Sequence, residues 1–174
     1  MSGLEELPEP PLRAHDLLAA LARHAVDFVV IGGLAGGAHG STYPTYDLDV
    51  AYDPAAGNLE RLASALREIE VTLTNAPDDL PFQVDAQTLE NGANFTFDTP
   101  YGRFDILGHV PGVRSYAELR DRSWSAEIEG VQVRIASIDH LIATKRAANR
   151  TKDKLMLEEY IVIADEQRRS EEGA

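Results

Sequence analysis

Two carboxylates one residue apart are the part of this sequence best suited to chemistry. Asp47 and Asp49 lie in the apolar run that follows Thr45. Residues i and i+2 of a strand face the same side, so both carboxylates would point one way while Leu48 and Val50 point into the core. Adjacent anions repel each other unless a positive charge lies between them. A divalent cation such as Mg²⁺, carrying a nucleoside triphosphate, is the usual solution.

A third carboxylate, Asp105, interrupts another apolar stretch at residues 103–107. Taken singly, Asp105 could pair with Arg103 or face solvent, and the pair at Asp47 and Asp49 could lie solvated on an edge strand. Three carboxylates sharing one ion site are a stronger hypothesis, because two Mg²⁺ ions can bracket an in-line phosphoryl transfer. In that interpretation Asp47 and Asp49 hold the ions, and Asp105 completes the site beside the attacking hydroxyl and helps to deprotonate it.

The glycine pair Gly32-Gly33 is the candidate for approach to phosphate. Glycines between a strand and a helix let the backbone come close to a ligand, and the helix start offers N–H donors. Ser41 could offer its hydroxyl to a phosphate, and Thr45 could hydrogen-bond the approach to the carboxylates. A purely structural turn is the alternative. No Walker loop and no GxGxxG motif is present, so a dinucleotide site is disfavoured.

Lys145 is the candidate cation for a triphosphate, which needs positive charge from the protein as well as from metal. It opens the basic segment KRAANRTKDK at 145–154. Helical spacing places Arg150 and Asp153 on one face, so Asp153 could be an ion-pair partner. The alternative for the whole segment is a solvated helix face.

The elements that must position these residues follow from hydrophobic periodicity and turn chemistry. The patterns predict helices at 12–25, 34–39, 58–69, 137–149 and 152–168, and extended segments at 26–31, 46–52, 71–74, 93–97, 103–107 and 127–135. Ser137 is a plausible N-cap, and the last helix would contact its neighbours through Leu155, Leu157, Ile161, Val162 and Ala164. The fold class is therefore mixed α+β with a helical C-terminal part.

Length and composition set further bounds. The chain has 174 residues, which suits one domain with a helical appendix. We expect a flexible, Pro-rich lead at 1–11, an α/β core at 12–136 and C-terminal helices at 137–170. The chain has no cysteine, which excludes disulfides and thiolate metal sites.

The net charge of −13 counts against a general nucleic-acid binder, because phosphate contacts require Lys and Arg. No apolar run is long enough to span a bilayer, and the first residues lack a signal-peptide pattern. These features predict a cytoplasmic protein with no membrane association.

Taken together, these motifs resemble the DNA polymerase β-type nucleotidyltransferase superfamily. The resemblance lies in VDFVVIGGLAGGAHGS, then TYDLDV, then FDIL, and it is greatest to the small bacterial AbiEii/MenT-like proteins. The later segment IDHLIATKRAANRTKDKLMLEEY resembles the helix pair of that branch. The resemblance runs from Leu17 to Tyr160 and implies a nucleotidyltransferase-like mixed sheet flanked by helices.

The resemblance also implies roles for the candidate residues. The phosphates would be lined by Gly32, Gly33 and Ser41, the metal pair would be Asp47 and Asp49, the third carboxylate Asp105, and the phosphate-contacting lysine Lys145. The family moves a nucleoside monophosphate from an NTP to an acceptor hydroxyl. In its toxin branch the acceptor is often a tRNA 3′ end, and an antitoxin restrains the enzyme.

Two positions depart from the pattern of that branch. Tyr43 stands where an Arg is common, and Met156 stands where a second Asp is common. Three hypotheses therefore remain: an NTP- and Mg²⁺-dependent nucleotidyltransferase that acts on tRNA as a toxin, the same reaction on a small molecule or a protein, and a non-catalytic nucleotide-binding or interaction module with the same fold.

Overall fold

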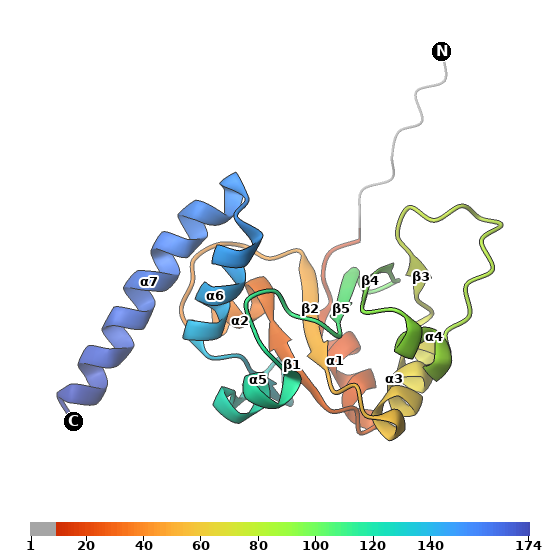
Figure 1. Ribbon diagram of the computed structural model, residues 1–174, viewed down its shortest axis with the longest axis horizontal. Coiled ribbons are helices and arrows are strands. Elements are labelled where there is room, and N and C mark those ends of the chain that lie inside the picture. The colour runs from red at the N-terminus through yellow and green to blue at the C-terminus, as the bar shows by residue number, and fades with distance from the viewer. Residues whose placement is uncertain (1–9) are drawn as a thin grey trace, which may run out of the picture.

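The computed structural model describes residues 10–174, and within them one mixed sheet lies between helices (Figure 1). The strand order is β3-β4-β5-β2-β1-β7-β6. Strand β2 pairs antiparallel with β1 and parallel with β5, while β1 also pairs parallel with β7. The strands are β1 Phe28–Ile31, β2 Asp47–Tyr52, β3 Thr72–Leu73, β4 Asn94–Asp98, β5 Arg103–Leu107, β6 Trp124–Ile128 and β7 Val131–Ile135. The predicted mixed α+β class is confirmed.

The helices cover the sheet and extend beyond it at the C-terminal end. They are α1 Ala14–Arg23, α2 Gly32–Ala38, α3 Ala56–Ile69, α4 Ala86–Asn91, α5 Tyr116–Arg122, α6 Ile138–Ala148 and α7 Thr151–Glu172. Most of the predicted lead, residues 1–9, falls outside the described part of the chain. No described helix combines the length and apolarity that crossing a membrane requires.

Strands β1 and β2 lie in the interior of the sheet, and each pairs with a neighbouring strand on both of its edges. All four residues of β1 are buried, and Leu48 and Val50 of β2 are fully buried. The alternation predicted for β2 is therefore confirmed: the apolar side chains enter the core and the two aspartates face the other way.

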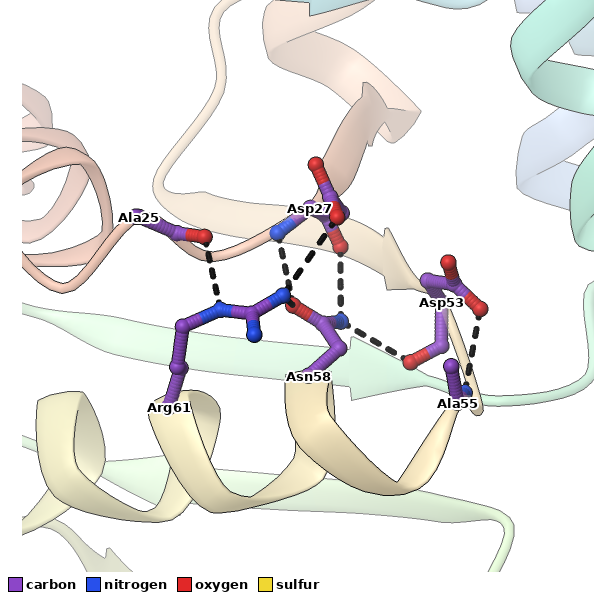
Figure 2. Close-up of polar contacts among 6 residues, drawn as sticks. All are labelled: Ala25, Asp27, Asp53, Ala55, Asn58 and Arg61. Atoms are coloured by element: carbon purple, nitrogen blue, oxygen red, sulfur yellow. Dashed lines mark hydrogen bonds and ion pairs between the residues drawn. The ribbon is translucent and has the colours of Figure 1, made fainter.

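A buried asparagine secures the β1–β2 pair at the end remote from the aspartates (Figure 2). Asn58 of α3 is 1% exposed. Its amide nitrogen donates to the carbonyl oxygens of Asp27 at 3.0 Å and Asp53 at 2.8 Å, and its Oδ1 accepts from the Asp27 N–H at 2.7 Å. Arg61, one turn later, donates from Nε to the carbonyl of Ala25 at 3.0 Å. These bonds fix the ends of both strands, and so the position of β2.

The two C-terminal helices pack against each other, and α7 lies at one side of the molecule (Figure 1). Ser137 caps α6 as predicted, accepting a hydrogen bond from the His140 N–H at 3.2 Å. The prediction for α7 is wrong at two positions, because Leu155 is 61% and Val162 is 55% exposed. The prediction is confirmed at the other three positions, because Ala164 is buried and Leu157 and Ile161 pack against the core. The helix also buries Asp153, Tyr160 and Ile163.

Candidate active-site cleft

The predicted carboxylates come together on two neighbouring strands. In the parallel register of β2 and β5, Asp49 stands opposite Asp105 and Asp47 opposite Arg103. All three aspartates are half-buried and line one cleft. The cleft encloses about 1200 Å³, including the space open to solvent at its mouth.

Asp49 and Asp105 place two acidic side chains close together in this site. Burial, then the hydrogen bond and charge of Asp105, and to a smaller extent the charge of Asp47, together raise the pKa of Asp49 to about 8. Lys145 acts in the opposite direction. The Oδ1 atom of Asp105 is buried and has no hydrogen-bond partner in the described part of the chain. The two facing carboxylates therefore lack the positive charge that would let both ionise.

The glycine pair packs directly against these side chains. Gly32 has φ +67°, and a Cβ there would overlap the Asp49 carboxylate. A Cβ on Gly33 would lie 2.8 Å from Thr45 Oγ1, which itself donates to the carbonyl of Asp47 at 3.0 Å. Helix α2 begins at Gly32, two residues before the predicted start at residue 34. The glycines thus start the helix and also leave room for the aspartate strand.

The lining of the cleft also includes an ion triad of two basic side chains around one buried aspartate. Asp153, with a side chain 3% exposed, accepts from Lys145 Nζ at 2.8 Å and from Arg150 Nε at 2.7 Å. Burial alone would raise the pKa of Asp153, but the hydrogen bonds from the two cations lower it. Lys145 and Arg150 line the same cleft as the aspartates.

Ser41 does not reach the cleft. Its Oγ accepts from the Tyr43 N–H at 3.3 Å. The next residue, Thr42, donates from its N–H and its hydroxyl to Glu159 of α7 at 3.0 and 2.8 Å. This loop is anchored to α7, and a contact between Ser41 and phosphate stays a prediction.

The cleft also contains residues that the sequence did not assign to the site, and Arg150, Met156 and Tyr160 are among them. Arg150 completes the ion triad, and Met156 and Tyr160 line the same cleft. Asp153, Met156 and Tyr160 follow helical spacing of three and four, which places them on one face of α7. That spacing, counted from Asp153 toward the C-terminus, was the signal that could have found them.

The ligands that the cleft could offer to Mg²⁺ are the carboxylate oxygens of Asp47, Asp49 and Asp105. Within residues 10–174, no group of three acidic or histidine side chains stands in a ready-made coordination geometry. Mg²⁺, however, is usually held by one or two carboxylates plus substrate phosphates and water. Asp105 Oδ1 is buried with no hydrogen-bond partner among the described residues, and Asp49 lies beside it, so both offer carboxylate oxygens of the kind that such an ion binds. The residue types therefore fit a divalent, oxygen-liganded ion.

Comparison with solved structures identifies the fold of the chain, whereas comparison by sequence finds no relative. No protein-family model matches the chain, and no curated protein matches its sequence. Among solved structures, the lincosamide antibiotic adenylyltransferase LnuA, in its lincomycin-bound form, is similar at 13% identity with a TM-score of 0.60, over 88% of this chain and 99% of that one. The chain has the nucleotidyltransferase fold.

Two further structures share the nucleotidyltransferase fold. ANT(2'')-Ia in complex with adenylyl-2''-tobramycin is 16% identical with a TM-score of 0.54, over 88% of this chain and 86% of that one. A proposed nucleotidyltransferase from Thermotoga maritima is 13% identical with a TM-score of 0.54, over 87% and 96% of the two chains. At these identities the likeness concerns the fold, and the resemblance to AbiEii/MenT-like proteins stays a prediction.

Proposed function

We propose that the protein is a Mg²⁺-dependent nucleotidyltransferase, which transfers a nucleoside monophosphate from an NTP to an acceptor hydroxyl. The observation that carries the proposal is the cross-strand pairing of Asp49 with Asp105, whose Oδ1 is buried without a hydrogen bond to any described residue. Carboxylate oxygens of this kind suit a hard divalent cation. Lys145 and Arg150 line the same cleft, where a polyphosphate needs cations from the protein.

Each residue of the cleft has a task in this reaction. Asp47, Asp49 and Asp105 would hold Mg²⁺, which supplies positive charge that neutralises the phosphates. Gly32 and Gly33 leave space for the phosphates to approach the backbone. The Thr45 hydroxyl holds Asp47 in place through a hydrogen bond to its backbone carbonyl. Lys145 contacts the phosphates that leave.

The chemical step is an in-line displacement. The acceptor oxygen forms a bond to the α-phosphorus, and the bond from that phosphorus to the bridging oxygen breaks. Pyrophosphate leaves with the electron pair, and the proton of the acceptor hydroxyl passes to Asp105. The reaction draws on the predicted core at 12–136 and the predicted C-terminal helices at 137–170, because the cleft has residues from both.

The acceptor we favour is a small molecule. The net charge of −13 opposes the approach of a polyanion such as RNA. The structures of LnuA with lincomycin and of ANT(2'')-Ia with adenylyl-2''-tobramycin show small molecules bound to this fold. Transfer to a tRNA 3′ end under control of an antitoxin is the second candidate, supported by the sequence resemblance, and a protein hydroxyl is the third.

The test offers every acceptor class at once. Purified protein is incubated with Mg²⁺, each α-³²P-labelled NTP in turn, and either total tRNA, a small-molecule panel of aminoglycosides and lincosamides, or a protein extract. We expect the label in the small-molecule fraction, whereas label in tRNA would favour the toxin hypothesis. Asp49→Asn should abolish transfer. Asp121→Asn is the matched control, because Asp121 is exposed on α5 and lies outside the cleft.

Two other outcomes separate the remaining hypotheses. Calorimetry that detects binding of Mg²⁺-NTP without any transfer would establish the non-catalytic nucleotide-binding module, which the departures at Tyr43 and Met156 motivate. Neither transfer nor NTP binding, with a folded protein, would refute nucleotide chemistry in this cleft.

A further inference from the structure

Tyr160 lines the cleft, and its hydroxyl makes no hydrogen bond to the described residues. The residue is 1% exposed, and its OH atom is buried with no partner among the described residues. It lines the same cleft as Asp49 and Lys145. Buried polar groups in native proteins are nearly always bonded, so an orphaned hydroxyl inside a functional cleft calls for a partner that arrives later.

The surroundings of this hydroxyl are shaped to accept it. Gly36 of α2 is buried, and a Cβ there would overlap the Tyr160 hydroxyl. Gly36 lies inside a helix, where its backbone does not require glycine. Because glycine has no side chain, Gly36 leaves room for the phenol of Tyr160, which belongs to a helix more than a hundred residues later in the chain. Elements far apart in the sequence thus enclose an oxygen that has no hydrogen-bond partner within residues 10–174.

The position of the hydroxyl indicates what would bind it. Tyr160 lies on the α7 face that also presents Asp153, which holds Lys145 and Arg150. On its other side is α2, whose Gly33 lines the cleft. The proposed polyphosphate path runs between this glycine and the two cations. A neutral donor at that point adds a hydrogen bond to an anion without adding charge.

The hydroxyl is also kept in its donating form. Burial raises the pKa of Tyr160 to about 12, and the charges of Glu159, Asp153 and Asp49 act in the same direction. At neutral pH the phenol therefore keeps its proton.

We propose that the Tyr160 hydroxyl donates a hydrogen bond to an oxygen of the β- or γ-phosphate, the two phosphates that leave as pyrophosphate, of the nucleotide bound in the cleft. This inference rests on the nucleotidyl transfer proposed above and adds a nucleotide-binding residue to it. In this arrangement Tyr160 contacts the phosphates, and they supply the partner that its hydroxyl does not have among the described residues.

The test compares two Tyr→Phe variants, each of which lacks one hydroxyl oxygen. Tyr160→Phe removes the proposed donor. Tyr116→Phe is the matched control, because the Tyr116 hydroxyl on α5 is also buried but the residue lines other cavities. For both variants and the unmodified protein, calorimetry measures the Kd of Mg²⁺-NTP and of Mg²⁺-pyrophosphate, and circular dichroism verifies the fold.

We expect Tyr160→Phe to weaken binding of both ligands about tenfold, the usual value for losing a hydrogen bond to a charged group. Tyr116→Phe should bind as the unmodified protein does. The inference is overturned if folded Tyr160→Phe binds both ligands normally, and the proposed function survives that result if transfer continues. If the unmodified protein binds neither ligand, the inference and the proposed function both fail. Weakened NTP binding with unchanged pyrophosphate binding would place the hydroxyl away from the phosphates and also overturn it.

Discussion

Replacing Asp49 by asparagine should stabilise the metal-free protein while it removes activity. The carboxylate faces Asp105 across parallel strands, and burial with this neighbour raises its pKa from 3.8 to about 8. A carboxamide carries no charge, and its N–H can donate to the Asp105 oxygen that lacks a partner within residues 10–174. The same substitution deprives Mg²⁺ of a ligand.

The magnitude follows from the pKa. At pH 8 Asp49 is ionised in the unfolded chain, whereas the folded protein must hold its proton or bear the repulsion. At about 1.36 kcal/mol per pH unit, the upper limit of the penalty is about 5 kcal/mol. Strand relaxation and entry of water and solvent cations reduce it, so we expect a gain of about 1–2 kcal/mol, or about 2–8 °C in Tm for a chain of this size.

The pH dependence has a definite sign. The folded pKa of Asp49 lies above its unfolded value, so the stability it contributes is fully present below about pH 4 and is lost as pH rises toward 8. Thermal melts in EDTA should therefore show an advantage of Asp49→Asn that grows from pH 4 to pH 8 and shrinks when Mg²⁺ is added. Asp121→Asn should show no such trend. An Asp49→Asn protein that melts at or below the unmodified protein at pH 8 would refute the reasoning.

Three further substitutions test other parts of the account. Lys145→Met should abolish transfer and lower the unfolding free energy by about 2 kcal/mol in urea titrations, because Asp153 stays buried with one partner fewer; adding Asp153→Asn should restore stability but not transfer. Gly32→Ala should lose activity and stability, since the new Cβ overlaps Asp49 at φ +67°, whereas Gly37→Ala, with open space around it, should raise the unfolding free energy by about 0.5–1 kcal/mol. Asn58→Ala should lower it by about 2–3 kcal/mol, since backbone groups it satisfies lose their partners, and a smaller loss would show that water replaces them.

Local patterns were enough to predict the strands that carry the carboxylates. Strand β5 has the predicted bounds, residues 103–107, and the period of two placed Asp47 and Asp49 on one face. Their meeting with Asp105 depends on β5 pairing parallel with β2, which is a matter of strand order. Periodicity contains no information about strand order, so the expectation came from the chemistry of a shared ion site and from the resemblance to a known family.

The features that sequence reasoning missed have physical reasons. Helices α4 and α5 have six and seven residues, too few for a 3.6-residue period to show. The bond between Lys145 and Asp153 joins two helices across the left-handed turn at Asn149, so spacing along one helix could not predict it. Exposure of Leu155 and Val162 was missed because the core-facing stripe of α7 is set by where α6 packs.

The most direct test of the central claim is the position of the transferred phosphorus. Parallel reactions contain Mg²⁺ and an NTP labelled at either the α- or the γ-phosphate, with the acceptor fraction that scores in the screen. The account predicts that α-label reaches the acceptor, that γ-label leaves as pyrophosphate, and that Asp105→Asn stops both. Transfer of γ-label, or α-label transfer that persists in folded Asp105→Asn, would contradict the assignment of this cleft to nucleotidyl transfer.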